Sequence, residues 1–153
     1  MILGNMVIGN RAKCSSSIRK YLNQRRIDNA AFLTEALKDV PGLKLPTVID
    51  NVKHVYHLYP VMIDPDEFGM TKEDFIYDIL NKYGIKVGFH YIPLHLTTAF
   101  KDRGFKNGQF PNAEKLGEQL VTLPINPRQT EEALEYLVKS IKAVRKQAVK
   151  TEV

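Results

Sequence analysis

Residues 71–90, TKEDFIYDILNKYGIKVGFH, decide the class of fold, because a helix signal is followed directly by a strand signal. Thr71 can cap a helix whose third residue is Asp74, an arrangement that satisfies free backbone N–H groups. A spacing of three or four residues puts the apolar side chains on one helix face: Phe75, Ile76, Ile79, Leu80 and Tyr83. Gly84 is predicted to end this helix, and Ile85–His90 is predicted to form a strand.

The segments on the N-terminal side predict one long helix and two strands. Residues 12–39 repeat apolar side chains at helical spacing, and Pro41 ends the pattern. Leu43–Val48 is predicted to be a short strand, and His54–Ile63 is the clearest strand because it is rich in β-branched and aromatic residues. Pro60 lacks a backbone N–H, which indicates that this strand lies at an edge or bends there.

The C-terminal side continues the alternation of helices and strands. Residues 96–101 predict a short helix, and Lys101–Phe110 is a polar, glycine-rich loop. Pro111 suits the first position of a helix that runs to about Gln119, and Val121–Ile125 follows as a short strand. Thr130 opens the last helix, whose apolar stripe consists of Leu134, Leu137, Val138, Ile141 and Val144.

Several links between these elements are too short for parallel crossovers throughout. We therefore expect an α+β fold, with a small, mainly antiparallel sheet covered by helices. The length of 153 residues allows one domain. A chain of about this size buries roughly two-thirds of its unfolded surface on folding, which is enough for a core.

The net charge of +5 is unevenly distributed, with a basic excess at both ends of the chain and an acidic middle. Clustered cations can neutralise nucleic-acid phosphates, so a small basic nucleic-acid-binding domain is one interpretation. Tyr21 is the single aromatic residue within either cluster, and one ring does not form a base-stacking platform. Solvated helix ends are therefore the favoured interpretation of the charge pattern.

The composition also excludes several classes of protein. No apolar run approaches the roughly 18 residues that a membrane span needs, so we expect a cytoplasmic protein without a membrane partner. The single cysteine, Cys14, excludes an internal disulfide framework and a cysteine-based zinc site. No metal site is predicted, because no metal-ligand motif includes the four histidines: His54, His57, His90 and His95.

The densest group of chemically able side chains lies in residues 88–95, GFHYIPLH. Histidine exchanges protons near neutral pH, and tyrosine can hydrogen-bond a hydroxylated or anionic ligand. Both types stand at the end of a predicted strand, where loops commonly carry function. An alternative is that His90 and Tyr91 are packing residues at a strand end. From composition alone, this alternative is the favoured interpretation.

Six stretches, taken in order, resemble the DegT/DnrJ/EryC1/StrS family of PLP-dependent sugar aminotransferases. They are NQRRIDNAAFLTEAL (23–37), PGLKLP (41–46), VYHLYP (55–60), GIKVGFHYIPLH (84–95), FPNAE (110–114) and LPINP (123–127). The resemblance implies a fold-type I aminotransferase, of which this chain is the C-terminal, small domain. It divides the chain into a poorly matched lead-in helix (1–22), the small domain (23–145) and a frayed basic tail (146–153).

The resemblance also implies an activity, the transfer of an amino group from an amino acid to a keto-sugar nucleotide in amino-sugar biosynthesis. Pyridoxal 5'-phosphate (PLP) is the implied cofactor of the complete enzyme. The family's Schiff-base lysine lies upstream of the matched residues, so no catalytic residue is expected here and the isolated chain is expected to be inactive. The implied partners are the missing large domain and the neighbouring subunit of a homodimer. A stand-alone dimerisation or interaction module is the alternative.

For the site, the resemblance implies that four residues of the same stretch lie near the sugar-nucleotide pocket: His90, Tyr91, Pro93 and His95. They are expected to orient the sugar or a phosphate. The family's G-x-N-x-R motif places an asparagine on the PLP phosphate of the neighbouring subunit. Its nearest match is Gly9-Asn10-Arg11, which lacks the intervening residues, and it makes Asn10 and Arg11 the cofactor-binding candidates.

Overall fold

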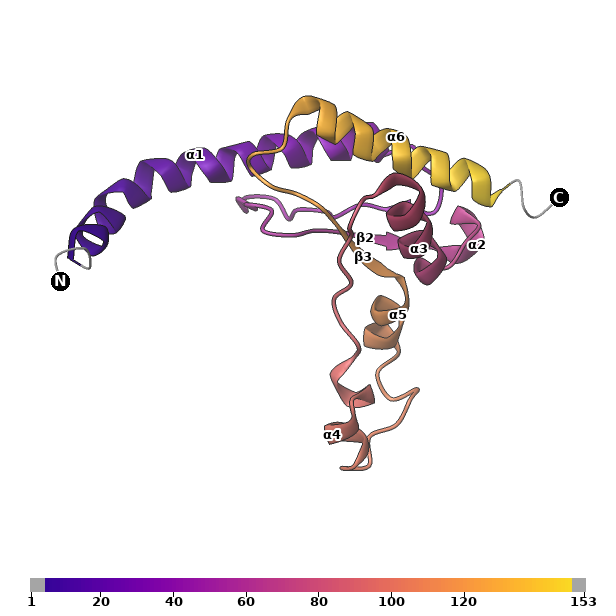
Figure 1. Cartoon of the computed structure of the whole chain (residues 1–153). Helices are drawn as coiled ribbons and strands as arrows, with labels where there is room; N and C mark the ends of the chain where they lie inside the picture. Colours follow the sequence, from indigo (N-terminus) through magenta and orange to yellow (C-terminus); the bar gives the residue numbers. More distant parts are fainter. Residues whose placement is uncertain (1–4, 150–153) are drawn as a thin grey trace.

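The computed structural model describes the backbone of residues 5–149 and the side chains of residues 16–149. Its elements follow along the chain as α1 (Asn5–Leu37), β1 (Leu43–Lys44), β2 (Tyr59–Ile63), α2 (Pro65–Phe68), α3 (Lys72–Tyr83), the 3-10 turn η1 (Leu94–Leu96), α4 (Thr98–Lys101), α5 (Pro111–Gln119), β3 (Leu120–Leu123) and α6 (Glu131–Ala148). The two long helices, α1 and α6, lie side by side above the small sheet, and a thin arm points away from them (Figure 1). None of the described helices is long and apolar enough to cross a membrane.

The sheet has three strands in the order β1-β2-β3, and both neighbouring pairs are antiparallel. Leu43 of β1 lies opposite Ile63, and Tyr59 of β2 lies opposite Leu123. With helices packed over this sheet, the predicted α+β fold is confirmed.

The two faces of β2 and β3 have different neighbours. Side chains alternate along a strand, so one face carries Tyr59, Val61, Ile63, Val121 and Leu123. All five are buried and belong to the apolar core. Thr122 stands between Val121 and Leu123 and therefore points to the opposite face. The core and the side chain of Thr122 consequently lie on opposite faces of the sheet.

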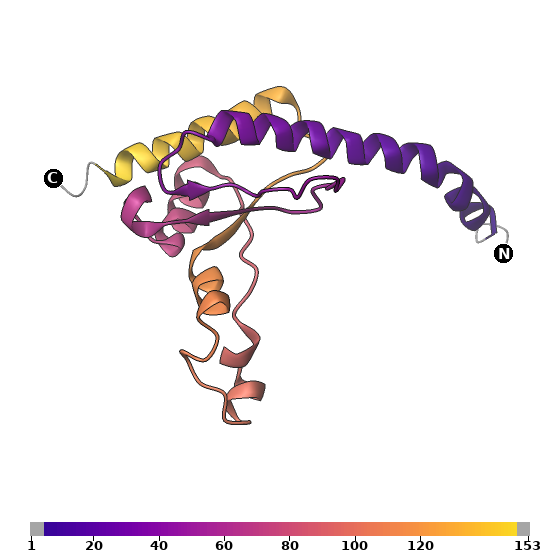
Figure 2. The same ribbon diagram turned by 180° about the vertical axis from the view of Figure 1, so that it is seen from behind.

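Three helices complete the core. The predicted stripe of α6 is buried along its length, and Phe75 and Ile79 of α3 are fully buried beside it. Of the described side chains in α1, the buried apolar ones lie near its C-terminal end: Ala30, Leu33 and Leu37. The N-terminal half of α1 extends past the rest of the molecule (Figure 2).

The predicted helix ends rest on local signals that the structure confirms. The Thr71 hydroxyl accepts a hydrogen bond from the backbone N–H of Asp74 (3.2 Å), and Gly84 ends α3 in the left-handed region with φ 66°. The Thr130 hydroxyl caps α6 by accepting from the N–H of Ala133 (3.3 Å). Each contact satisfies a backbone group that has no partner inside its helix.

The strand predicted over His54–Ile63 is half wrong, because only Tyr59–Ile63 pairs in the sheet. Asn51 and Tyr56 have positive φ angles of 64° and 47°, and such a turning backbone cannot continue a ladder. His54 and His57 therefore lie in an irregular segment. Pro60 lies in β2, the central strand of the sheet. On the β1 side of β2, pairing reaches only to Met62, so no strand of the described chain pairs with Pro60 on the β1 side.

The strand predicted over Ile85–His90 is also wrong in extent. Only Gly88 pairs with the sheet, through an isolated bridge to Thr122 that has two backbone hydrogen bonds of 2.9 and 2.7 Å. The chain then leaves the sheet and enters the arm (Figure 1). This single bridge fixes the point at which the arm begins.

Candidate functional site

Residues 89–119 form the arm that projects from the sheet, and they include η1, α4 and α5 (Figures 1 and 2). The chain runs outward through the loop 89–93 and returns through α5. At the base of the arm, the loop and α5 enclose a cavity of about 170 Å³. The wall of the cavity also includes Lys72, which is the first residue of α3.

Three of the four predicted substrate-binding residues line this cavity: His90, Tyr91 and Pro93. His90 Nδ1 lies 2.9 Å from the hydroxyl of Thr122, which is only 6% exposed. The sheet therefore holds the imidazole on the face that does not carry the core. A Cβ on Gly88 would lie 2.8 Å from His90 Cε1, so the absence of a side chain there lets the imidazole occupy this place.

Tyr91 lies at the open side of the cavity, where its side chain is 76% exposed. Its ring contacts the His90 ring edge to face, with centroids 4.7 Å apart and planes at 83°. The peptide bond between these two residues is cis. Imidazole and phenol thus lie together at one edge of the cavity, and both can hydrogen-bond a hydroxylated ligand.

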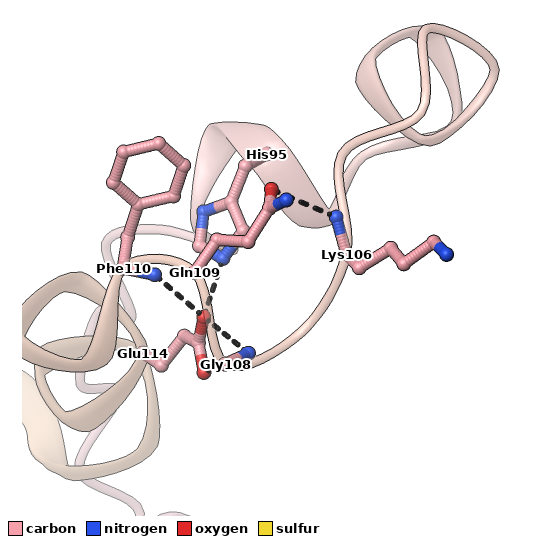
Figure 3. A network of polar contacts seen from close by, with 6 residues as sticks. All are labelled: His95, Lys106, Gly108, Gln109, Phe110 and Glu114. Carbon is pink, nitrogen blue, oxygen red and sulfur yellow. Dashed lines mark hydrogen bonds and ion pairs between the residues drawn. The ribbon is translucent and has the colours of Figure 1, made fainter.

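The fourth predicted residue, His95, does not line the cavity but is buried behind it in the arm. Its Nε2 lies 2.7 Å from Glu114 Oε1, as Figure 3 shows. The Glu114 carboxylate also accepts from the backbone N–H groups of Gly108 (2.9 Å) and Phe110 (3.2 Å). This network ties η1, the loop 101–110 and α5 into one unit.

The charge of Glu114 is set by competing effects. Burial raises the pKa of the Glu114 carboxyl, but hydrogen bonds from the Gly108 N–H, the His95 side chain and the Phe110 N–H outweigh burial and leave the pKa below its ordinary value. The carboxylate therefore stays ionised at neutral pH. Although Glu114 lines the cavity, its charge is directed into the arm.

Sequence reasoning missed Lys72 and Gly117, which also line the cavity. Lys72 Nζ donates to the carbonyl of Gly117 at 2.5 Å and lies 3.2 Å from Glu73 Oε1. A Cβ on Gly117 would lie 2.8 Å from Pro93 Cδ, so α5 and the loop touch at this point. A glycine inside a helix is the signal that could have indicated the close approach.

The remaining candidates are not part of this cavity. The side chains of Asn10 and Arg11 lie outside the described residues, although their backbone is helical. Between residues 16 and 149, no group of three or more His, Cys, Asp or Glu side chains could hold a metal ion. His54 and His57 line a separate surface hollow that the arm does not reach.

The cavity does not fit the covalent attachment of a PLP group. Such attachment needs a lysine with a free amine, and Lys72 is the lysine among the described cavity residues. Its Nζ donates a hydrogen bond to the Gly117 carbonyl and forms an ion pair with the Glu73 carboxylate. The described part of the cavity wall therefore offers no attachment point for the aldehyde of the cofactor.

Comparisons with known proteins match most of the chain. An uncharacterized protein of Methanocaldococcus jannaschii is 36% identical over 80% of this chain and 32% of that protein. The dTDP-3-amino-3,6-dideoxy-alpha-D-galactopyranose transaminase of Aneurinibacillus thermoaerophilus is 34% identical over 78% of this chain and 30% of that enzyme. The chain thus spans about a third of the length of these curated relatives.

A solved structure and a family model agree with these relatives. The PLP-form structure of Spr1654 from Streptococcus pneumoniae is similar with a TM-score of 0.73 and 27% identity, over 83% of this chain and 32% of that one. The model of the DegT/DnrJ/EryC1/StrS aminotransferase family matches residues 19–142, a range that includes the whole cavity. The chain therefore belongs to the DegT/DnrJ/EryC1/StrS aminotransferase family.

Proposed function

We propose that this chain is the C-terminal, substrate-facing part of a PLP-dependent aminotransferase that acts on a keto-sugar nucleotide. The observation that carries the proposal is the cavity between the loop 89–93 and α5, which lies inside the region matched by the family model. The relative from A. thermoaerophilus, a transaminase of a dTDP-linked sugar, supports the substrate class. The PLP form of the similar solved structure supports the cofactor.

Within the cavity, His90 and Tyr91 orient the ligand. The hydroxyl of Thr122 holds the His90 imidazole, which leaves Nε2 for a ligand oxygen. The phenol of Tyr91 is exposed at the open side and can donate to or accept from a sugar hydroxyl. Pro93 supplies an apolar wall. When PLP is bound elsewhere in the complete enzyme, it supplies the electron sink for amino transfer.

The rest of the enzyme is the proposed partner, as a large domain and as the neighbouring subunit of a homodimer. Two groups of exposed apolar side chains support this. One lies on the segment 48–58 (Val48, Ile49, Val52, Val55, Leu58), and the other lies on the arm (Phe89, Ile92, Leu94, Phe110, Leu116). Exposed apolar side chains that gather on one segment are typical of protein contacts.

The domain limits at residues 22 and 145, and the cytoplasmic location, stay predictions.

The isolated chain is proposed to lack transaminase activity, because the family's lysine segment is not part of the matched stretches. To test this, the purified chain is mixed with PLP, reduced with borohydride and analysed by mass spectrometry. No site-specific lysine adduct is expected. A stoichiometric adduct on one lysine would contradict this part of the proposal.

Binding of a sugar nucleotide tests the proposed substrate class and the proposed site. In a ¹⁵N–¹H NMR titration of this chain, dTDP-glucose is expected to shift the amide signals of Tyr91 and Ile92, whereas free thymidine is not. His90→Ala should weaken this binding by about tenfold, the usual effect of losing a hydrogen bond to a polar ligand group. His57→Ala is the matched control, since His57 is exposed away from the cavity. Shifts confined to other regions would refute the site.

A further inference from the structure

Lys72 is a cation in the wall of the cavity, and neither the fold nor the proposed function assigns it a role. Its side chain is only 12% exposed, so much of the hydration that normally stabilises an ammonium group is lost. It is also the first residue of α3, where the positive end of the helix dipole disfavours a cation. Helix stability therefore does not explain the position of this charge.

The partners of the Lys72 ammonium leave its charge largely uncompensated. The Gly117 carbonyl is neutral, and the Glu73 carboxylate belongs to a side chain that is 71% exposed, where a pairing contributes little. Glu114 also lines the cavity, but its carboxylate is occupied by His95, Gly108 and Phe110. An ammonium group has three donors, and of these two contacts only the one with the Gly117 carbonyl is a hydrogen bond.

The hydrogen bond to the Gly117 carbonyl also fixes the position of Lys72 Nζ, and both residues line the cavity. A lysine on the surface must give up rotamer freedom when it binds a ligand, whereas this side chain is already ordered. His90 and Tyr91 line the same cavity, so three side chains with N–H or O–H donors converge on it.

We propose that Lys72 binds an anionic oxygen group of the ligand, namely the diphosphate of the sugar nucleotide. Lysine binds phosphate as a point charge with movable donors, and the bond to Gly117 uses one donor of Nζ and leaves others for the ligand. This step rests on the proposed function for the identity of the ligand. The carboxylate of an amino-acid donor offers the same chemistry, and the experiment separates the two sources.

NMR titrations of this chain with inorganic pyrophosphate, dTDP-glucose, thymidine and glutamate test the proposal. Pyrophosphate is expected to shift the amides of Lys72, Tyr91 and Glu118. Lys72→Gln keeps a donor for the Gly117 carbonyl but removes the charge, and it should weaken pyrophosphate binding by about tenfold or more. Lys72→Arg keeps the charge and should bind within about threefold of the parent chain.

Lys115→Met is the matched control, because Lys115 is an exposed lysine on α5 that does not line the cavity. It should leave the affinity unchanged. Glu118→Gln removes an exposed carboxylate from the cavity wall and should strengthen pyrophosphate binding. Folding of each variant is checked by the dispersion of its amide spectrum.

The outcomes separate the two proposals. Equal pyrophosphate affinity in the parent chain and in a folded Lys72→Gln variant overturns the role of Lys72, as does the absence of pyrophosphate shifts at the cavity. If pyrophosphate binding depends on Lys72 but dTDP-glucose does not bind, the anion site stands and the sugar-nucleotide function fails. Binding of glutamate rather than pyrophosphate, lost in Lys72→Gln, overturns the assignment of the anion to a diphosphate.

Discussion

His90 and Thr122 are 32 residues apart in the sequence, yet the imidazole Nδ1 lies 2.9 Å from the threonine hydroxyl. The same two segments are joined through the backbone, where Gly88 and Thr122 exchange two hydrogen bonds. The loop that carries the candidate site is therefore held on the sheet by one bridge and one side-chain contact. Its geometry depends on the face of β3 opposite the core.

Thr122→Val should release the His90 ring while keeping the shape of the buried side chain. The loss of one hydrogen bond is expected to cost about 1 kcal/mol in the free energy of unfolding and to weaken dTDP-glucose binding by roughly three- to tenfold. The measurements are urea unfolding and the ¹⁵N shifts of the His90 ring. Thr122→Ser keeps the hydroxyl and should behave like the parent chain. Unchanged ring shifts in the valine variant would show that the contact does not position His90.

Glu114→Gln should reveal a pH-dependent contribution of the arm network to stability. The pKa of Glu114 is lower in the folded chain than its ordinary value of 4.5, so its stabilisation is fully present above that value. The stabilisation is lost as the pH falls through the lowered folded pKa. Urea unfolding should therefore show a parent chain more stable than the variant at neutral pH, and a gap that shrinks as the pH falls below about 4.5.

The control for this experiment is Glu118→Gln, since Glu118 is an exposed carboxylate of the same helix. That substitution should change the free energy of unfolding little at any pH. A stability gap for Glu114→Gln that stayed constant down to acid pH would mean that the carboxylate charge is not what the network stabilises.

The parts of the fold that could be predicted from the sequence are those set by neighbours in the chain. Thr71, Gly84 and Thr130 act on residues three to five positions away, and the helices that they delimit are where the sequence predicted them. Strands depend on pairing with segments that are distant in the chain, and local sequence patterns do not identify those segments. His54–Leu58 has strand-forming residues, but positive φ angles at Asn51 and Tyr56 turn the chain before it can pair.

The same division applies to the site. His90, Tyr91 and Pro93 stand in one short stretch, so their proximity follows from the sequence alone. Lys72 reaches the carbonyl of Gly117 across 45 residues, and only the packing of α3 on the base of the arm creates that contact. His95 is in the predicted stretch but points to Glu114 instead, because the arm needs a partner for a buried carboxylate.

Gly42→Ala should be strongly destabilising. Gly42 has φ +74°, and a Cβ there would lie 2.7 Å from both Glu67 C and Phe68 Cα, which are backbone atoms that cannot move aside. Strain and overlap together are expected to lower the free energy of unfolding by roughly 2–5 kcal/mol. Gly104→Ala is the matched control, since Gly104 has φ +91° with nothing within 4 Å of the new atom, and it should cost only about 1 kcal/mol. Equal costs in urea unfolding would show that overlap with α2 adds nothing.

Gly117→Ala separates the shape of the cavity from the stability of the fold. The new Cβ would lie 2.8 and 2.9 Å from Pro93 Cδ and Cγ, so the loop 89–93 must move away from α5. Alanine is a better helix former than glycine by about 1 kcal/mol, which offsets part of the overlap in the free energy of unfolding. We therefore expect little change in unfolding but displaced Tyr91 and Ile92 amide signals and weaker dTDP-glucose binding. Asn112→Ala, an exposed change on the same helix, should leave both signals and affinity as they are. If Gly117→Ala keeps the parent affinity, contact between α5 and Pro93 does not shape the ligand site.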